Sequence, residues 1–117
     1  SPELVTQLLA NVFSNIRRHT NIDDAVQVTL KRNRHEVDLV IEDSGPGLPD
    51  AAYTKGIQFF QRFDQSRSRE SGGSGLGMSI VRGIVNSENG SIELKKSTLG
   101  GLAIHFTFPL AQNSSEN

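Results

Sequence analysis

Two asparagines and an arginine share one edge of the first predicted helix. Asn11 and Asn15 are four residues apart, and Arg18 follows three residues later. At about 100° per residue, the three side chains fall within about 60° of one another, beside the apolar face of the helix. Amide oxygens can coordinate Mg²⁺, and a guanidinium group can bind phosphate oxygens. The row predicts a cation or phosphate site; solvated polar positions on the helix surface are the alternative interpretation.

A carboxylate follows the second predicted strand, in the run Asp43-Ser44-Gly45-Pro46-Gly47. This position places Asp43 at the end of a sheet, beside glycine backbone that a ligand can approach closely because it carries no Cβ. Such a carboxylate can accept a hydrogen bond from an exocyclic amine, which is the contact needed to recognise adenine. An ordinary Asp-Gly turn is the alternative.

A glycine-rich run, residues 72–77, leads directly into the second long predicted helix. Glycines at a helix N-terminus let backbone N–H groups and the helix dipole face a phosphate chain. The run is not a Walker loop, because no Gly-Lys-Ser/Thr ends it, and it lacks the preceding strand of a dinucleotide-binding fingerprint. It predicts an anion cradle, with a flexible hinge as the alternative.

Composition limits the remaining classes of function. The 117 residues suffice for one domain, which we place at residues 1–110, with a disordered polar tail at 111–117. With 12 Lys+Arg against 13 Asp+Glu, the chain offers no basic field for nucleic acid or an anionic membrane. Without cysteine there is no thiolate metal site or thiol catalysis, and no apolar run reaches membrane-spanning length, so a cytoplasmic domain is expected.

Hydrophobic periodicity predicts the elements that position these groups. A first helix should run to about Arg18, and a second from near Leu76 to about Asn89. Strands are expected at 25–30 and 37–41 as a hairpin about the turn 31–34, then at 91–95 and 102–108, with a short helix at 50–55. Residues 64–75 have no apolar side chain and are expected to be mobile. The core face of the first helix should comprise Val5, Leu8, Leu9, Val12, Phe13 and Ile16.

In this order and spacing, the motifs resemble the catalytic domain of sensor histidine kinases, within the ATPase superfamily that includes gyrase, Hsp90 and MutL. LLANVFSNIRRHT resembles the N box, DSGPG the first glycine box, FFQRF the F box, GGSGLGMSIVRGIV the second glycine box and GGLAIHFTFP the closing strand. The F box and the GLGMSIV helix favour a histidine kinase over gyrase-like members. The resemblance covers about residues 8–109. It implies the Bergerat ATP-binding fold, an α+β two-layer sandwich whose mixed, mostly antiparallel sheet is covered on one face by helices.

The resemblance also implies roles for residues, with ATP and Mg²⁺ as the ligands. Asn15 would bind Mg²⁺, Asn11 would contact the phosphates, and Arg18 would lie near the outer phosphates. His19 would stack on adenine, and Asp43 would accept its amino group.

Further roles follow from the glycine boxes and the F box. Residues 61–75 would form the ATP lid, in which Arg62 swings toward the γ-phosphate. Asn11, Arg18 and Arg62 are thus the expected catalytic groups. Thr107 would support Asp43 through water. Gly45 and Gly47 would shape the adenine pocket, and Gly73, Gly75, Leu76 and Gly77 would contact the phosphate chain.

The sequence departs from the family in two respects. Ile16 stands where the family usually has alanine, and the phosphoacceptor segment, a histidine followed by an acid, an arginine and a proline, does not occur around His19, His35 or His105. We therefore expect the domain to donate the γ-phosphoryl group of Mg-ATP to a histidine on a separate helical domain.

The expected partners are that phosphoacceptor domain and a response regulator, without nucleic acid or direct membrane contact. The parent kinase is expected to be anchored in a bacterial inner membrane. The alternatives are an anti-sigma-type serine kinase, a self-contained ATPase, or a nucleotide-binding docking module without turnover.

Overall fold

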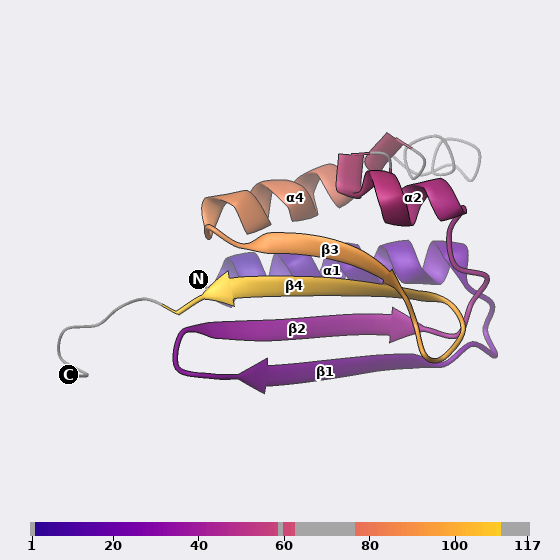
Figure 1. Ribbon diagram of the computed structural model, residues 1–117, viewed down its shortest axis with the longest axis horizontal. Helices are drawn as coiled ribbons and strands as arrows, with labels where there is room; N and C mark the ends of the chain where they lie inside the picture. The colour runs from indigo at the N-terminus through magenta and orange to yellow at the C-terminus, as the bar shows by residue number, and fades with distance from the viewer. Residues whose placement is uncertain (1, 59, 63–76, 111–117) are drawn as a thin grey trace, which may run out of the picture.

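A computed structural model describes residues 2–58, 60–62 and 77–110, apart from the side chains of Pro2 and His19. The chain begins with a long helix and a strand hairpin, continues through short helical segments, and ends with a helix and two strands (Figure 1). Residues 57–58 and 60–62 are also helical. The elements are α1 (Pro2–His19), β1 (Val26–Arg32), β2 (Glu36–Asp43), α2 (Asp50–Lys55), α4 (Gly77–Ser87), β3 (Ser91–Lys96) and β4 (Leu102–Pro109).

The strands form one sheet in the order β1-β2-β4-β3, and each neighbouring pair is antiparallel. The register brings Ile41 of β2 and Leu94 of β3 beside Ile104 of the central strand β4. The predicted α+β two-layer fold is confirmed. The parallel pairing that a mixed sheet requires is not found among the described strands.

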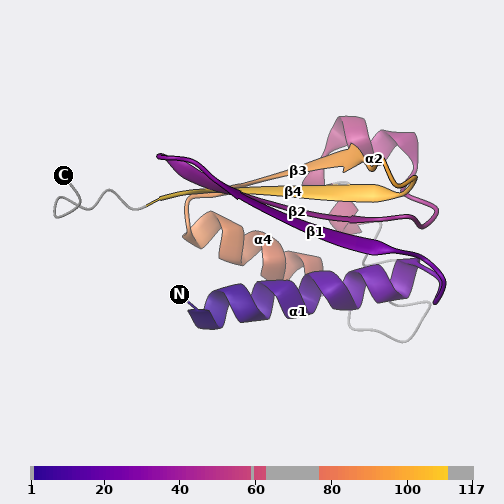
Figure 2. The ribbon, with the colours of Figure 1, turned by 90° about the horizontal axis from the view of Figure 1, so that it is seen from below.

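Two helices, α1 and α4, lie on one face of the sheet and pack against each other (Figure 2). The core fills the space between this helical layer and the sheet. It includes Leu8, Val12, Ile41, Phe60, Met78, Val81, Ile104 and Phe106, all of which are almost fully buried. No helix in the described part of the chain is long and apolar enough to cross a bilayer.

Most predicted boundaries lie close to the observed ones. The short helix at 50–55 is found as predicted, whereas both hairpin strands extend further than expected, to Arg32 and Asp43. The second helix begins within the described residues at Gly77, and its C-terminus is closed by Gly90, whose N–H donates to the Val85 carbonyl over 2.9 Å. Leu76, the predicted start, and residues 64–75 lie outside the described residues, as does the predicted tail at 111–117.

The predicted core face of the first helix was too broad. Leu8, Val12 and Ile16 are buried as expected, but Val5 is 51% exposed and Phe13 is 36% exposed. Phe13 lies on the edge of α1 opposite Asn11, which is the residue beside the start of α4. Val5 lies in line with Val12 and Ile16, but it is near the N-terminal end of α1, where it lines an apolar hollow of about 260 Å³ together with Leu39 and Ile84. Periodicity identifies an apolar stripe, but the neighbouring elements decide how much of its width is covered.

We predict that Ile104→Ala destabilises the fold by about 2–5 kcal/mol, because it leaves a cavity in the core between the side chains of Ile41 and Leu94. Leu30→Ala on the edge strand is the matched control: Leu30 is 68% exposed, and its truncation should cost less than about 1 kcal/mol. Urea denaturation of both variants measures the difference. Equal losses would contradict the assignment of the core.

Candidate functional site

The carboxylate of Asp43 is buried where β2 ends beside the start of β4. Its side chain is 4% exposed, and Oδ1 accepts hydrogen bonds from the N–H of Gly45 at 2.9 Å and of Leu102 at 3.2 Å. The main-chain oxygen of Asp43 accepts from the N–H of Gly101 at 3.0 Å. Within the described residues, Oδ2 accepts no hydrogen bond. Backbone donors therefore fix the orientation of the carboxylate while one oxygen remains available to a ligand.

Asn15 lies in the same small cavity as Asp43. This cavity of about 10 Å³ is lined by Asn15, Ile16, Asp43, Gly47, Leu48 and Leu102. Asn15 is 2% exposed, and burying an amide is unfavourable unless its polar atoms are engaged. The structure thus brings together the amide of α1 and the acid of β2, two groups that the sequence separates by 28 positions.

Asn11 lies one turn earlier on α1, next to the start of α4. Its Nδ2 donates to the carbonyl of Gln7 at 2.8 Å, and a Cβ built on Gly77 would lie 3.5 Å from its Oδ1. The side-chain oxygen therefore lies close to the N-terminal end of α4. The N-terminus of a helix carries partial positive charge and free N–H groups, which favour anions.

The loop between β2 and α2 is held in a fixed shape. Gly47 has a φ of +73°, a left-handed conformation that favours glycine. The next residue, Leu48, donates its N–H to the hydroxyl of Tyr53 on α2 over 3.0 Å. On the solvent-exposed side, Lys96 of β3 forms an ion pair with Asp50 of α2 at 3.4 Å and lies 5.8 Å from the centre of the Tyr53 ring, contacts that contribute little to stability.

The loop after α1 is joined to the same region. The Ser44 hydroxyl accepts from the N–H of Ala25 at 2.7 Å and donates to Asp24 at 3.3 Å. Gly45 fits closely there, since a Cβ at this position would lie 2.8 Å from the Thr20 side chain. Asp43 and the end of α1 are thereby linked through the segment 20–25.

The remaining predicted site residues are only partly described. Arg18 is half-buried in the last turn of α1, and Arg62 is exposed at the end of the helical residues 60–62. The side chain of His19 lies outside the described part of the structure, as do Gly73, Gly75 and Leu76. Of the predicted set, the structure groups Asn15, Asp43 and Gly47 around one cavity. Gly45 is hydrogen-bonded to Asp43, and Asn11 and Gly77 are adjacent to each other.

Comparison with known proteins places this arrangement in a family. Residues 1–112 match the family described as histidine kinase-, DNA gyrase B-, and HSP90-like ATPase. The chain belongs to this ATPase family. The family resemblance predicted from the sequence motifs is therefore confirmed, and within the family the chain is similar to the catalytic domains of sensor histidine kinases.

Relatives and solved structures agree on this placement. The chain is 36% identical over 107 residues to the signal transduction histidine-protein kinase BaeS of Escherichia coli, covering 92% of this chain and 23% of BaeS. It is 37% identical over 91 residues to the probable sensor histidine kinase TcrY of Mycobacterium tuberculosis, covering 78% and 19% respectively. The ATPase domain thus spans about a quarter or less of the length of these relatives.

Two solved structures share the fold. The mycobacterial sensor histidine kinase MprB gives a TM-score of 0.75 at 26% identity, over 93% of this chain and 74% of MprB. The catalytic domain of the histidine kinase ThkA gives a TM-score of 0.73 at 25% identity, over 93% of this chain and 69% of that structure.

One predicted residue lies elsewhere in the ATPase domain. Thr107 was expected to support Asp43, but its hydroxyl donates to Asp38 over 3.0 Å. The register pairs Thr107 with Asp38 and Ala103 with Glu42, so Thr107 is about 17 Å along β4 from the Asp43 end. It also faces away from the helices. The expected role of Thr107 is therefore corrected: it belongs to the open face of the sheet.

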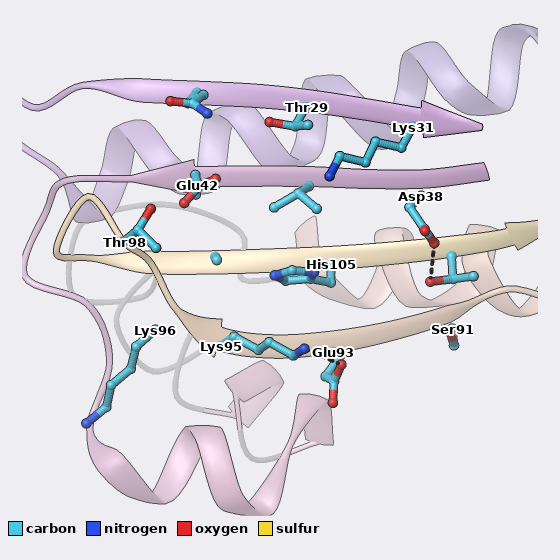
Figure 3. A pocket seen from close by; sticks show the side chains of 14 residues that line it. Thr29, Lys31, Asp38, Glu42, Ser91, Glu93, Lys95, Lys96, Thr98 and His105 are labelled. Carbon is cyan, nitrogen blue, oxygen red and sulfur yellow. Dashed lines mark hydrogen bonds and ion pairs between the residues drawn. The ribbon is translucent and has the colours of Figure 1, made fainter. Parts of the chain in front are cut away.

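That open face forms a broad hollow of about 770 Å³. Figure 3 shows Lys31, Asp38 and His105 standing on it, with the helices behind the sheet. Three lysines and three acids share its lining, so it carries charges of both signs. The hollow lacks the grouped amides, buried carboxylate and helix N-terminus of the Asp43 region, which we therefore regard as the candidate site.

Sequence reasoning missed the contribution of the glycine pair before β4. A Cβ on Gly101 would lie 2.7 Å from the Asp43 carbonyl oxygen and 2.8 Å from the Gly45 nitrogen. Glycine at this position is what allows β4 to approach the carboxylate. The signal was present in the Gly100-Gly101 pair, but its partner lies 58 positions away in the chain.

We predict that Gly101→Ala destabilises the ATPase domain by about 1–3 kcal/mol, because backbone atoms occupy the space that the methyl group needs. Gly83→Ala in α4 is the control: nothing lies within 4 Å of its Cβ position, and helix propensity should stabilise the domain by about 0.5–1 kcal/mol. Thermal or urea unfolding distinguishes the two. Equal effects of the two substitutions would refute the close approach.

Proposed function

We propose that this ATPase domain binds Mg-ATP at the Asp43 cavity and donates the γ-phosphoryl group to a histidine on a separate helical domain. The observation that carries the proposal is the shared burial of Asp43 and Asn15 in one cavity, with a carboxylate oxygen left free among the described residues. An adenine amino group would donate to that oxygen, while Gly45 and Gly47 would border the base. His19 would stack on it.

The cavity is smaller than a purine ring. At about 10 Å³ it has room for roughly one water molecule. Nucleotide binding therefore requires its walls to separate. Leu48, which is held by its backbone hydrogen bond to Tyr53, and Leu102 at the start of β4 are the apolar walls that would move.

The donor set fits a magnesium ion shared with phosphates. The described residues contain no group of three or more His, Cys, Asp or Glu side chains that could hold a metal by themselves. Mg²⁺ commonly uses one or two protein oxygens together with substrate phosphates and water. Asn15 would supply the protein oxygen, and the bound ion would neutralise phosphate charge. Asn11 and Arg18 would contact the phosphate side.

The start of α4 would complete the phosphate site. Its first residue, Gly77, lies next to Asn11, and the N–H groups at a helix N-terminus favour negative charge. Gly73, Gly75, Leu76 and Gly77 would supply further backbone contacts to the phosphates, and residues 61–75 would form the ATP lid. Arg62 would approach the terminal phosphate. These groups position the phosphate chain and stabilise its charge.

The nucleophile would come from outside these residues. A neutral imidazole on a phosphoacceptor helical domain would attack the γ-phosphorus, ADP would leave, and the phosphoryl group would pass to a response regulator. Similarity to BaeS and TcrY supports these partners, and supports a cytoplasmic domain within a membrane-anchored bacterial kinase.

The other activities considered from the sequence remain distinguishable by experiment. A serine kinase of the anti-sigma type would phosphorylate a protein serine, and a self-contained ATPase would release phosphate unaided. A docking module would bind Mg-ATP without transfer. Incubation with a supplied phosphoacceptor domain separates all three from histidine phosphorylation.

We predict that Asp43→Asn lowers affinity for Mg-ATP about 10- to 100-fold, because a carboxylate acceptor for the adenine amine is replaced by an amide that can turn a donor toward it. The substitution keeps the size of the side chain and an oxygen for the Gly45 and Leu102 N–H groups. Asp38→Asn on the same strand, but on the open face, is the matched control and should leave affinity unchanged. Calorimetry with an ATP analogue measures both, and unchanged affinity in Asp43→Asn would refute the site.

We further predict that the 117-residue chain does not phosphorylate itself on histidine. None of its three histidines has the sequence context of a phosphoacceptor. Mass spectrometry of the purified chain after incubation with Mg-ATP should show the unmodified mass. A phosphohistidine adduct would contradict the proposal that the acceptor belongs to another domain.

A further inference from the structure

Gln61 forms a bridge between two segments that flank the glycine-rich run. The preceding residue, Phe60, is fully buried in the core and anchors this helical turn. Gln61 is half-buried, and its Nε2 donates to the Ser79 hydroxyl over 2.7 Å. Its Oε1 accepts from the Arg82 guanidinium over 3.2 Å. The side chain thus contacts the first two turns of α4.

The direction of the amide is fixed by the chemistry of its partners. Arginine can only donate hydrogen bonds, so the carbonyl oxygen of Gln61 must face Arg82. The NH₂ group is then directed at the Ser79 hydroxyl, which can accept. Ser79 and Arg82 are three residues apart on α4 and lie on one face of the helix. A single side chain therefore restrains both the position and the rotation of α4 relative to residues 60–62.

We propose that Gln61 is a positioning residue that sets Arg62 for the terminal phosphate of ATP. The inference rests on the proposed function. It adds Gln61 to the site as a residue that positions another residue and does not itself contact the nucleotide. Arg62 follows Gln61 directly, so the bridge to α4 fixes the backbone from which Arg62 extends. The start of α4 lies beside Asn11, on the phosphate side of the proposed site. Gln61 would then fix the distance between the Arg62 backbone and the N-terminus of α4.

A positioning role for Gln61 predicts different effects on ATP binding and on ADP binding. A contact from Arg62 to the terminal phosphate exists with ATP and is missing with ADP. Loss of the bridge should therefore weaken ATP binding and leave ADP binding unchanged. A residue that only stabilised the fold would affect both nucleotides alike.

The test uses Gln61→Met, which preserves side-chain length and removes both hydrogen bonds. Calorimetry with Mg²⁺ and either the non-hydrolysable analogue AMPPNP or ADP should show a loss of roughly 5-fold for AMPPNP, as expected for about 1 kcal/mol of hydrogen bonding, and no loss for ADP. In an Arg62→Met background, Gln61→Met should add nothing, because the two residues act together.

Rescue and control variants complete the design. Gln61→Glu can accept from both Arg82 and a rotated Ser79 hydroxyl, so AMPPNP affinity should return to the wild-type value. Gln58→Met, on an exposed residue of the same segment, should change nothing. If Gln61→Met does not fold by thermal melt, Arg82→Met removes one of the two hydrogen bonds instead and should weaken AMPPNP binding alone, by less than about 5-fold.

The outcomes separate this inference from the function on which it rests. Equal losses for AMPPNP and ADP, or no loss for either, would overturn the role of Gln61 while leaving the nucleotide site intact. Failure of the wild-type chain to bind either nucleotide would refute the proposed function, and the positioning role with it.

Discussion

The Asp43 carboxylate is the interaction on which the arrangement of the site depends. A buried carboxylate needs hydrogen-bond donors, and here they are backbone N–H groups of the loop that follows it and of the strand beside it. Gly101 must lack a side chain for that strand to come close enough. The end of β2, the start of β4 and the glycine loop therefore adopt one mutually dependent geometry.

The helical layer adds a second constraint. α1 buries one stripe against the core and carries its asparagines at the edge of that stripe, so packing the helix also positions Asn15 beside Asp43. The packing of α4 against α1 brings the start of α4 to Asn11. The packing of α1 and α4 therefore also sets the positions of Asn11 and Asn15. A change in helix packing would move these asparagines relative to Asp43.

The near-neutral charge of the chain implies that any bound phosphate is stabilised by groups close to it. A net charge of −1 provides no long-range attraction for a nucleotide. Backbone N–H groups at a helix N-terminus, neutral amides and a few arginines can stabilise a phosphate chain at short range instead. Gln61 would position Arg62 relative to the N-terminus of α4 without adding charge to the site.

The sequence by itself determined the order of the elements, the family and the chemical types at the site, because periodicity, glycine runs and motif spacing are local properties of the chain. It predicted the short helix at 50–55 and the row that contains Asn15. Only the tertiary structure decided that Val5 and Phe13 are exposed, that Thr107 pairs with Asp38 at a distance from Asp43, and that Gly101 admits the main chain beside Asp43. Each of these depends on strand register and on which element covers which face, and such long-range pairings leave no periodic trace in the chain.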